Sequence, residues 1–305
     1  MSPKSKIVIN PIAGVGNNTK RLWTQIESIL KSGGLSFDHE YTQGRGHALD
    51  IAARAVKEGY DHIVAVGGDG TIHEVANGVL STTTDGSVTL GVISTGTGND
   101  FIKTVGIPKD YREACGVILG STRRVIDVGL VEFTGKNGQR ESRFFVNGAG
   151  VGFDAEVADG SKRVPRFMGS TVPFVLALIK IFPFYRNKDM KLDVDGLVSN
   201  KRLLSLVVSN GSFFGGGMRI APFASLNDGR LDVVALGDVG KLELLRVFPR
   251  VYKGTHVTHK KVSVEKARVV KVDCAKPILL QADGEILGYG PVAIQVIPQA
   301  LLLAV

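Results

Sequence analysis

The chain has 305 residues, 44% of them hydrophobic, which is enough apolar material for two domains with separate cores. Lys and Arg outnumber Asp and Glu by 37 to 29, giving a net charge of +8 that suits an anionic partner as well as plain solubility. Cys115 and Cys274 stand far apart without metal-ligand spacing, which excludes a disulfide scaffold and favours a reducing compartment. No apolar signal region precedes the first strand, so we expect a cytoplasmic protein.

The first 130 residues alternate short apolar runs with amphipathic stretches. Repeated strand–helix–strand spacing of this kind is typical of a parallel, doubly wound α/β sheet. We therefore expect a nucleotide-binding α/β domain over residues 1–130. The expected strands are residues 6–10, 36–41, 63–66, 88–94 and 124–130, and the expected helices are residues 19–31, 46–59, 71–80 and 111–119.

Three glycine-rich loops follow strands in this domain, at residues 10–17, 67–71 and 95–100. The carboxyl ends of parallel strands meet at one edge of a sheet, so we expect the three loops to gather there. Glycines allow the backbone to approach a ligand closely, and the N–H groups of a following helix bind phosphate. Asp69, within Gly-Gly-Asp-Gly-Thr, would repel phosphate unless it binds a cation or accepts a proton. The combination indicates phosphoryl transfer; the alternative for residues 67–71 alone is an ordinary turn between a strand and a helix, with Asp69 as a helix cap.

After Gly129 the pattern changes to many short strands with few helices. This predicts a mostly antiparallel β-sandwich domain over residues 131–295. The apolar segment 296–305 is expected to return to the first domain. Strands are expected at residues 144–151, 190–194, 203–210, 231–236, 261–264, 269–273, 278–282 and 292–297, and helices at 167–182 and 241–252.

The longest apolar run, residues 172–182, is well short of the ~20 residues that cross a bilayer. It fits either a buried helix or an interfacial helix, because aromatic and basic residues flank it. On the second interpretation, the segment from Phe167 to Arg186 contacts the membrane. The flanking basic residues are Lys162, Arg163, Arg166 and Arg186.

The motifs, taken in order, resemble the diacylglycerol kinase catalytic-domain family, in its soluble bacterial or archaeal branch, with sphingosine kinases as relatives. The resemblance runs over nearly the whole chain. In the first domain it rests on Asn-Pro-Ile-Ala-Gly from Asn10, the loop 67–71 with Glu74, and Gly-Thr-Gly-Asn-Asp-Phe from Gly96. In the second it rests on Phe-Val-Asn-Gly-Ala-Gly from Phe145, Ala-Pro from Ala221, Asn-Asp-Gly-Arg-Leu-Asp from Asn227, and Asp-Gly-Glu from Asp283.

The resemblance implies an ATP site in the first domain. Thr42, which the resemblance places near the nucleotide, has a second interpretation as the end of a strand. Asn99 and Asp100, in the loop that approaches the phosphates, have a second interpretation as the cap of a helix. The residues that the resemblance assigns to nucleotide are Asn10, Pro11, Gly14, Thr42, Gly67, Gly68, Asp69, Gly70, Thr71, Glu74 and Thr95.

Magnesium has two expected places. One is the nucleotide near Asp69, where Asp100, Asp127 and Asp228 are candidates to bind through water, since Mg²⁺ keeps several of its waters. The other, implied by the resemblance, is a structural site built from the Asp228 carboxylate and the carbonyls of Ser225 and Arg230. An Asn-Asp-Gly hairpin turn that needs no metal is the alternative.

The general base that removes the proton from the lipid hydroxyl is, by the resemblance, Glu285 of the Asp-Gly-Glu motif. Read without the resemblance, the same residues form an ordinary hairpin. Asp69 is the rival base.

We therefore expect an ATP- and Mg²⁺-dependent lipid kinase that converts diacylglycerol to phosphatidic acid. Its partner would be a lipid at a membrane surface, contacted peripherally and without a transmembrane span, and not a nucleic acid; a homodimer is compatible with the sequence. The alternatives are a kinase of a soluble metabolite, of the NAD kinase type, and a non-catalytic nucleotide or lipid sensor. Several lipids present a hydroxyl beside apolar chains, and the sequence does not choose among them.

Overall fold

A computed structural model describes residues 4–14, 16, 18–135, 137–163 and 171–305. The chain divides into two compact units. Unit 1 comprises Met1–Asp127 together with Pro298–Val305, and unit 2 comprises Val128–Ile297. The sequence predicts these boundaries near residues 130 and 296.

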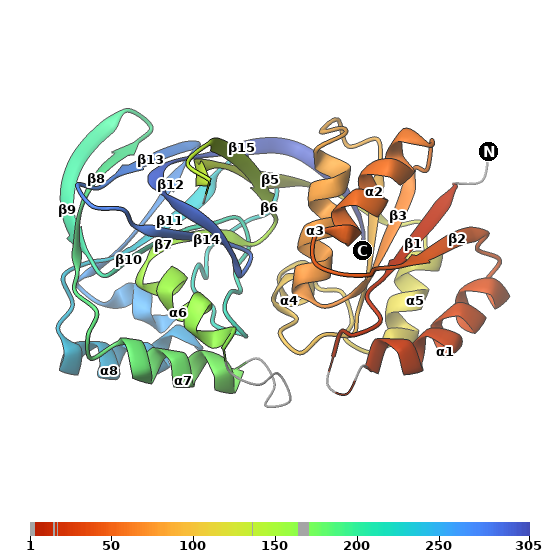
Figure 1. Cartoon of the computed structure of the whole chain (residues 1–305), viewed down its shortest axis with the longest axis horizontal. Coiled ribbons are helices and arrows are strands. Elements are labelled where there is room, and N and C mark those ends of the chain that lie inside the picture. Colours follow the sequence, from red (N-terminus) through yellow and green to blue (C-terminus); the bar gives the residue numbers. More distant parts are fainter. Residues whose placement is uncertain (1–3, 15, 17, 136, 164–170) are drawn as a thin grey trace. The chain divides into compact units, whose positions relative to one another are not determined.

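Unit 1 is built on a parallel sheet with the strand order β2-β1-β3-β4-β15 (Figure 1). The inner strands β1, β3 and β4 are largely apolar because both faces are covered, and every residue of β3 is buried. The edge strand β2 is more polar and has no buried residue. The last strand is supplied by the end of the chain, where Leu302 and Leu303 pair with Thr89 and Leu90. The strands are β1 (Ser5–Ile9), β2 (Phe37–Tyr41), β3 (His62–Gly67), β4 (Thr89–Ser94) and the end of β15 (Glu285–Ala304).

Helices cover this sheet in two groups, with α2 packed on α3 and α1 packed on α5 (Figure 1). Helix α1 buries one apolar stripe, with Trp23, Ile26 and Leu30, whereas α3 is buried over most of its surface. The predicted doubly wound α/β fold is confirmed, although the short helix α4 was not predicted. The helices are α1 (Asn18–Ser32), α2 (His47–Lys57), α3 (Asp69–Leu80), α4 (Asp100–Val105) and α5 (Tyr111–Leu119).

Unit 2 is a mostly antiparallel, sandwich-like β structure, as predicted. One path of strands runs β12-β11-β10-β7-β14-β15, while β13 joins β15 to β8 and β5 joins β15 to β6. Inward-facing residues of these strands form one apolar cluster around Phe145, Leu206 and Leu280. The strands are β5 (Arg123–Gly135), β6 (Arg140–Phe145), β7 (Gly148–Gly152), β8 (Lys188–Val194), β9 (Leu197–Leu203), β10 (Ser205–Ser209), β11 (Leu231–Leu236), β12 (Val262–Ala267), β13 (Val269–Asp273) and β14 (Leu279–Ala282).

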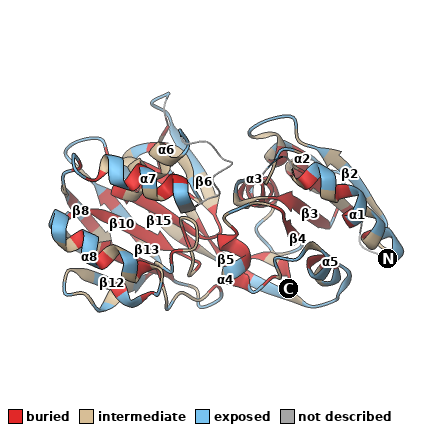
Figure 2. Ribbon diagram, turned by 90° about the horizontal axis from the view of Figure 1, so that it is seen from below, coloured by how far each residue is buried: buried red, intermediate tan, exposed pale blue. Residues whose placement is uncertain are grey.

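Three helices of unit 2 enclose a second apolar cluster, which includes Phe153, Phe174, Leu178 and Leu244. They are α6 (Phe153–Ser161), α7 (Thr171–Ile181) and α8 (Lys241–Val251), and α7 and α8 each carry exposed residues as well as buried ones (Figure 2). The prediction of only two helices here was wrong, because α6 contains Asp, Gly and Ser and shows little amphipathic pattern. Phe167, the predicted start of the α7 segment, lies outside the described residues. Within the described part of the chain, no helix is both long and apolar enough to cross a membrane.

Candidate active site

The order of strands in unit 1 creates a switch point between β1 and β3. The chain leaves β1 toward β2 on one side, and then crosses back to β3 and β4 on the other. In open α/β sheets, ligands bind in the crevice beyond the carboxyl ends of the strands at such a point. Asn10 follows β1 and the loop Gly67–Thr71 follows β3, so the sequence places two of its glycine-rich loops at the switch point.

Hydrogen bonds tie these two loops to each other and to the third. The Asn10 side-chain amide donates to Thr71 Oγ1 at 3.0 Å, and the Asn10 backbone N–H donates to Val66 O at 2.9 Å. The N–H of Thr95, which follows β4, donates to Gly67 O at 2.8 Å. The Thr95 hydroxyl also hydrogen bonds to that of Thr19, whose N–H donates to Ala13 O in the first loop.

The loops approach so closely that side chains would not fit between them. A Cβ on Gly96 would lie 2.5 Å from the Cα of Gly68, and a Cβ on Gly14 would lie 2.6 Å from Thr95 O. Gly14 also has a φ of +78°, which disfavours other residues. The predicted convergence of the three loops is confirmed for their described residues; Val15 and Asn17, in the first loop, lie outside them.

Asp69 lies at the start of α3, where its carboxylate holds the third loop. Its Oδ2 accepts from Asn99 N at 2.8 Å and its Oδ1 accepts from Phe101 N at 3.3 Å. Asn99 has a φ of 61° and accepts a hydrogen bond from Ser94 at 2.7 Å. Asp69 therefore has a structural task alongside any chemical one. Gly70, beside it, is exposed.

Glu74 and Thr42 also form contacts within unit 1. The Glu74 carboxylate accepts hydrogen bonds from Gly46 N at 2.9 Å and Ala48 N at 3.2 Å, and so stabilises the N-terminus of α2. Thr42 N donates to Ile9 O at 2.8 Å, continuing the pairing of β2 with β1. Pro11 is partly exposed beside Asn10.

Asp100 and Asp127 are both buried. Asp100 begins α4, adjacent to the Asn99 that Asp69 holds. Asp127 accepts a hydrogen bond from Gln299 N at 2.8 Å, at the position where β15 enters unit 1. Over the described residues, no group of three or more His, Cys, Asp or Glu side chains is arranged to hold a metal ion.

The turn from Ser225 to Arg230 in unit 2 is already balanced by a cation of the chain itself. Asp228 Oδ1 accepts from Arg230 N at 3.1 Å, and Asp228 Oδ2 forms an ion pair with Lys266. The Lys266 ammonium also lies 3.5 Å from Asp232, whose pKa is raised by burial. An ammonium next to the single carboxylate of the expected metal site does not fit a Mg²⁺ cage, so we derive no step through a metal at this turn.

The Asp-Gly-Glu motif forms a tight hairpin between β14 and β15. Asp283 and Gly284 have φ angles of 48° and 83°, both in the left-handed region that two-residue hairpin loops require. Oxygens of the Asp283 carboxylate accept hydrogen bonds from the N–H groups of Val146, Asn147 and Gly148 at 2.9 to 3.0 Å. Glu285 follows directly, partly exposed, and forms a 3.0 Å ion pair with Lys162 at the end of α6.

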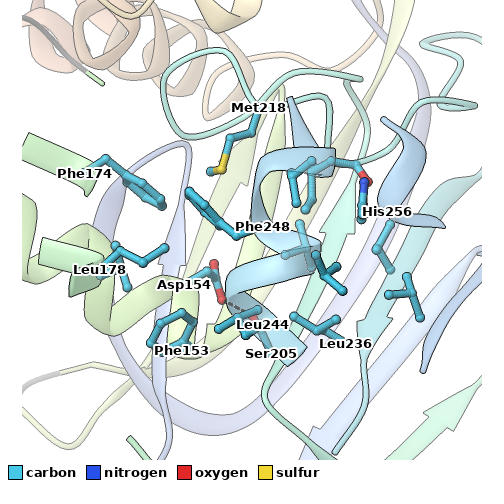
Figure 3. A pocket seen from close by; sticks show the side chains of 17 residues that line it. Phe153, Asp154, Phe174, Leu178, Ser205, Met218, Leu236, Leu244, Phe248 and His256 are labelled. Atoms are coloured by element: carbon cyan, nitrogen blue, oxygen red, sulfur yellow. Dashed lines mark hydrogen bonds between the residues drawn. The ribbon is translucent and has the colours of Figure 1, made fainter. Parts of the chain in front are cut away.

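Unit 2 also contains a cavity of about 80 Å³ between α6, α7, α8 and the β10–β11 face (Figure 3). Its walls are almost entirely apolar, with Phe174, Met218 and Phe248 among them. Polar groups enter it from Asp154, Ser205 and His256. Asp154 is not among the predicted site residues; the sequence signal for it is a carboxylate directly after Phe153, between the apolar strand β7 and the apolar residues of α6.

Two sequence families match the chain. The diacylglycerol kinase catalytic domain matches residues 4–131, and the YegS C-terminal NAD kinase beta sandwich-like domain matches residues 148–305. Among curated proteins, the chain is 31% identical to the diacylglycerol kinase of Bacillus subtilis (strain 168) over 290 residues, covering 94% of this chain and 91% of that protein. It is also 31% identical to the diacylglycerol kinase of Mycobacterium tuberculosis (strain H37Rv), over 98% of this chain and 94% of the relative.

Solved structures share the fold. A diacylglycerol kinase from Bacillus anthracis superimposes with a TM-score of 0.72 at 21% identity, covering 99% of this chain and 96% of its own. The yeast NADH kinase structure is more distant, with a TM-score of 0.50 at 9% identity, covering 99% of this chain and 82% of its own.

Proposed function

The chain belongs to the diacylglycerol kinase family and is a lipid kinase, and from this premise we propose that it phosphorylates diacylglycerol with ATP. The products would be phosphatidic acid and ADP. The observation that carries the nucleotide part of this proposal is the meeting of three glycine-rich loops at the switch point of unit 1. Their backbones are close enough to exclude side chains, as a surface that binds phosphates requires.

Within unit 1 we assign the phosphates of ATP to the loops that start at Asn10, Gly67 and Thr95. The start of α3 directs backbone N–H groups and the positive end of the helix dipole toward an anion. Asp69 and Asp100, at the starts of α3 and α4, are the carboxylates we assign to magnesium. When bound, Mg²⁺ would neutralise charge on the phosphates.

Glu285 is our candidate for the general base. In the proposed reaction, the lipid hydroxyl oxygen forms a bond to the γ-phosphorus as its proton passes to the Glu285 carboxylate. The bond between the γ-phosphorus and the bridging oxygen breaks, and ADP leaves. The two backbone-bonded oxygens of Asp69 favour Glu285 over Asp69, because a base must be able to gain a proton without releasing a loop.

For the lipid we assign an acyl chain to the apolar cavity of unit 2. The cavity has room for only a few water-sized groups. An acyl chain would therefore insert only its terminal carbons, or would displace side chains such as Met218. This assignment explains why a cavity that is apolar on nearly every side lies in the same unit as Glu285.

We further propose that α7 and α8 contact the membrane from which the lipid comes. On α7, Val172, Leu176 and Ile179 are exposed at spacings of four and three, so they share one face. On α8, Leu242 and Leu245 are exposed as well, at 75% and 56%. Such apolar faces, with exposed Lys180, Lys241 and Arg246 among them, fit an anionic bilayer surface.

The direct test is ADP release from ATP and Mg²⁺ with diacylglycerol in mixed micelles, with NAD, or with no acceptor. We expect turnover with diacylglycerol, and its loss by ~10²–10⁴-fold in Glu285→Gln, with the KM for ATP retained. Turnover with NAD alone would overturn the proposal in favour of a metabolite kinase. If Asp69→Asn loses more kcat than Glu285→Gln while ATP affinity is kept, the base is Asp69.

A further inference from the structure

A partly buried hydrogen-bond chain connects the cavity of unit 2 to the turn that carries Glu285. It begins at Asp154 in the first turn of α6, whose Oδ1 accepts from the Ser205 hydroxyl at 2.6 Å (Figure 3). Asp154 Oδ2 accepts from the Gln281 side-chain amide at 3.0 Å. Gln281 is fully buried on β14, two residues before Asp283.

The chain then reaches the turn itself. The Gln281 side-chain oxygen accepts a hydrogen bond from Gly284 N at 2.8 Å, and Gly284 immediately precedes Glu285. Donors and acceptors are matched at each step: Ser205 donates to Asp154, the Gln281 amide donates to Asp154, and the Gln281 oxygen accepts from the backbone. Reversing the amide would break two bonds, so Asp154 determines which way Gln281 faces.

The sequence provides space for this pair at one position. A Cβ on Gly150 would lie 1.5 Å from Asp154 Oδ2 and 2.7 Å from the Gln281 amide nitrogen. Only glycine therefore allows the carboxylate and the amide to meet beneath β7. The pair places a partly buried polar contact beside an apolar cavity, and desolvation raises the pKa of Asp154. Such a contact needs a reason other than core stability.

We propose that Asp154 and Gln281 are positioning residues for Glu285: they hold the Asp283–Gly284 turn from its inner side, as the three N–H bonds to Asp283 hold it from the β6–β7 side. This inference rests on the proposed role of Glu285 as the base. Neither side chain has to touch ATP or the transferred phosphoryl group. Their effect is to restrict where the Glu285 carboxylate lies when it receives the proton.

The loss of such positioning has a measurable effect on the reaction rate. A reacting group displaced by about 1 Å can cost on the order of 10²-fold in rate, even when the change is remote from the chemistry. Loosening the turn should therefore lower kcat while leaving ATP binding in unit 1 unchanged. The loss should stay below that caused by removing the base.

The first experiment compares Gln281→Met and Asp154→Ala with Asp154→Asn. Methionine has a similar length to glutamine but cannot bond to Gly284 or Asp154, and alanine removes both acceptors of Asp154. Asparagine can keep the network, because its oxygen accepts from Gln281 while its amide donates to Ser205, whose hydroxyl can also accept. We expect kcat to fall ~10–100-fold in the first two variants, with little change in the KM for ATP, and to stay near wild type in Asp154→Asn.

The second experiment places Gln281→Met in a Glu285→Gln background. If Gln281 acts through Glu285, the double variant should be no slower than Glu285→Gln alone. A general loss of structure would instead add a further decrease. Thermal unfolding of every variant is followed in parallel, and Ser205→Ala, which removes a single bond, serves where Asp154→Ala does not fold.

A matched control is available in the same unit. Asp195 and Gly196 form another left-handed turn, with φ angles of 48° and 89°, and the Asp195 carboxylate accepts from the N–H groups of Arg268 and Val269. Asp195→Ala should lower stability without lowering kcat.

The outcomes separate this inference from the proposed function. If Glu285→Gln is fully active, or the wild-type enzyme does not phosphorylate diacylglycerol, the proposed function fails. If Glu285→Gln is inactive while folded Gln281→Met and Asp154→Ala match wild type, the positioning role fails alone. If Asp154→Asn folds but loses as much kcat as Asp154→Ala, Asp154 acts through its charge, and the inference is overturned.

Discussion

At the scale of single residues, the hydrogen bonds show which candidate side chains also stabilise the local backbone. Glu74 and Asp69 both lie in or beside the Gly-Gly-Asp-Gly-Thr motif, and both carboxylates accept two backbone N–H groups from other segments. Substituting either residue should therefore disturb a helix or loop start as well as any ligand. Glu285 differs, since its ion pair is with another side chain, that of Lys162.

His62 allows a prediction about pH. It is buried on β3, with Nδ1 3.2 Å from the Ser5 hydroxyl, and desolvation, aided by Arg123, lowers its pKa to about 4. The unfolded chain takes up this proton near pH 6.5, whereas the folded chain resists until about pH 4. The stability contribution is therefore complete above pH 6.5 and is lost as the pH falls toward 4, by about 3 kcal/mol at most.

The measurement uses Trp23, the chain's single tryptophan, which lies in unit 1 as His62 does. Urea unfolding of unit 1 is followed by Trp23 fluorescence. In the wild type, the urea concentration at the midpoint should fall between pH 7 and pH 4.5. In His62→Gln this dependence should be shallower. If the pH dependence is the same in His62→Gln as in the wild type, His62 takes up its proton at the same pH in the folded chain as in the unfolded chain.

At the scale of elements, the structure shows which residues of α7 and α8 are exposed and could contact a membrane. Of the basic residues that flank the apolar run, Lys162 pairs with Glu285, Arg163 pairs with Asp159 at 2.9 Å, and Arg166 lies outside the described residues. Arg186 is exposed. The apolar faces should therefore contribute more to membrane binding than these four charges do.

We predict that Leu176→Glu with Ile179→Glu weakens binding to phosphatidylglycerol vesicles by at least ~10-fold, because each buried leucine or isoleucine side chain is worth about 1.5–3 kcal/mol. Both residues are exposed, so the fold should be kept. Sedimentation with vesicles at low and high salt measures the effect. The control is Leu197→Glu with Val198→Glu, an exposed apolar pair on the β8–β9 hairpin. Equal pelleting of the two double variants would contradict a specific role for α7.

At the scale of the whole molecule, two strands belong to both units: β5 crosses from unit 1 into unit 2 after Asp127, and β15 returns after Ile297. β15 begins with Glu285 in unit 2 and ends in unit 1, where Leu301, Leu303 and Ala304 are fully buried against the parallel sheet. Residues 298–305 thus complete the sheet that carries the three glycine-rich loops.

We predict that Leu303→Ala destabilises unit 1 by about 2–5 kcal/mol, the usual range for a buried leucine. Trp23 fluorescence should report an earlier transition. Leu280→Ala, equally buried but in the core of unit 2, is the matched control and should leave that transition near its original position. A Trp23 transition shifted equally by both variants would show that the two units unfold together.

The sequence by itself determined the features that local pattern encodes. Alternating apolar runs predicted the parallel sheet, and the glycines after β1, β3 and β4 predicted the loops that meet at its edge, because strand polarity alone brings those ends together. The Asp-Gly-Glu hairpin was likewise predicted from its turn residues, although its role came from the family resemblance.

Only the tertiary structure decided which groups these loops bond to. The bonds of Asp69 to Asn99, of Asp228 to Lys266, and of Gln281 to Asp154 join positions 30, 38 and 127 residues apart. No periodicity encodes such pairings, since they depend on which distant segments the fold brings together. Helix α6 was missed for the same reason: its residues have weak helical preference, and packing against α7 and β14 stabilises it.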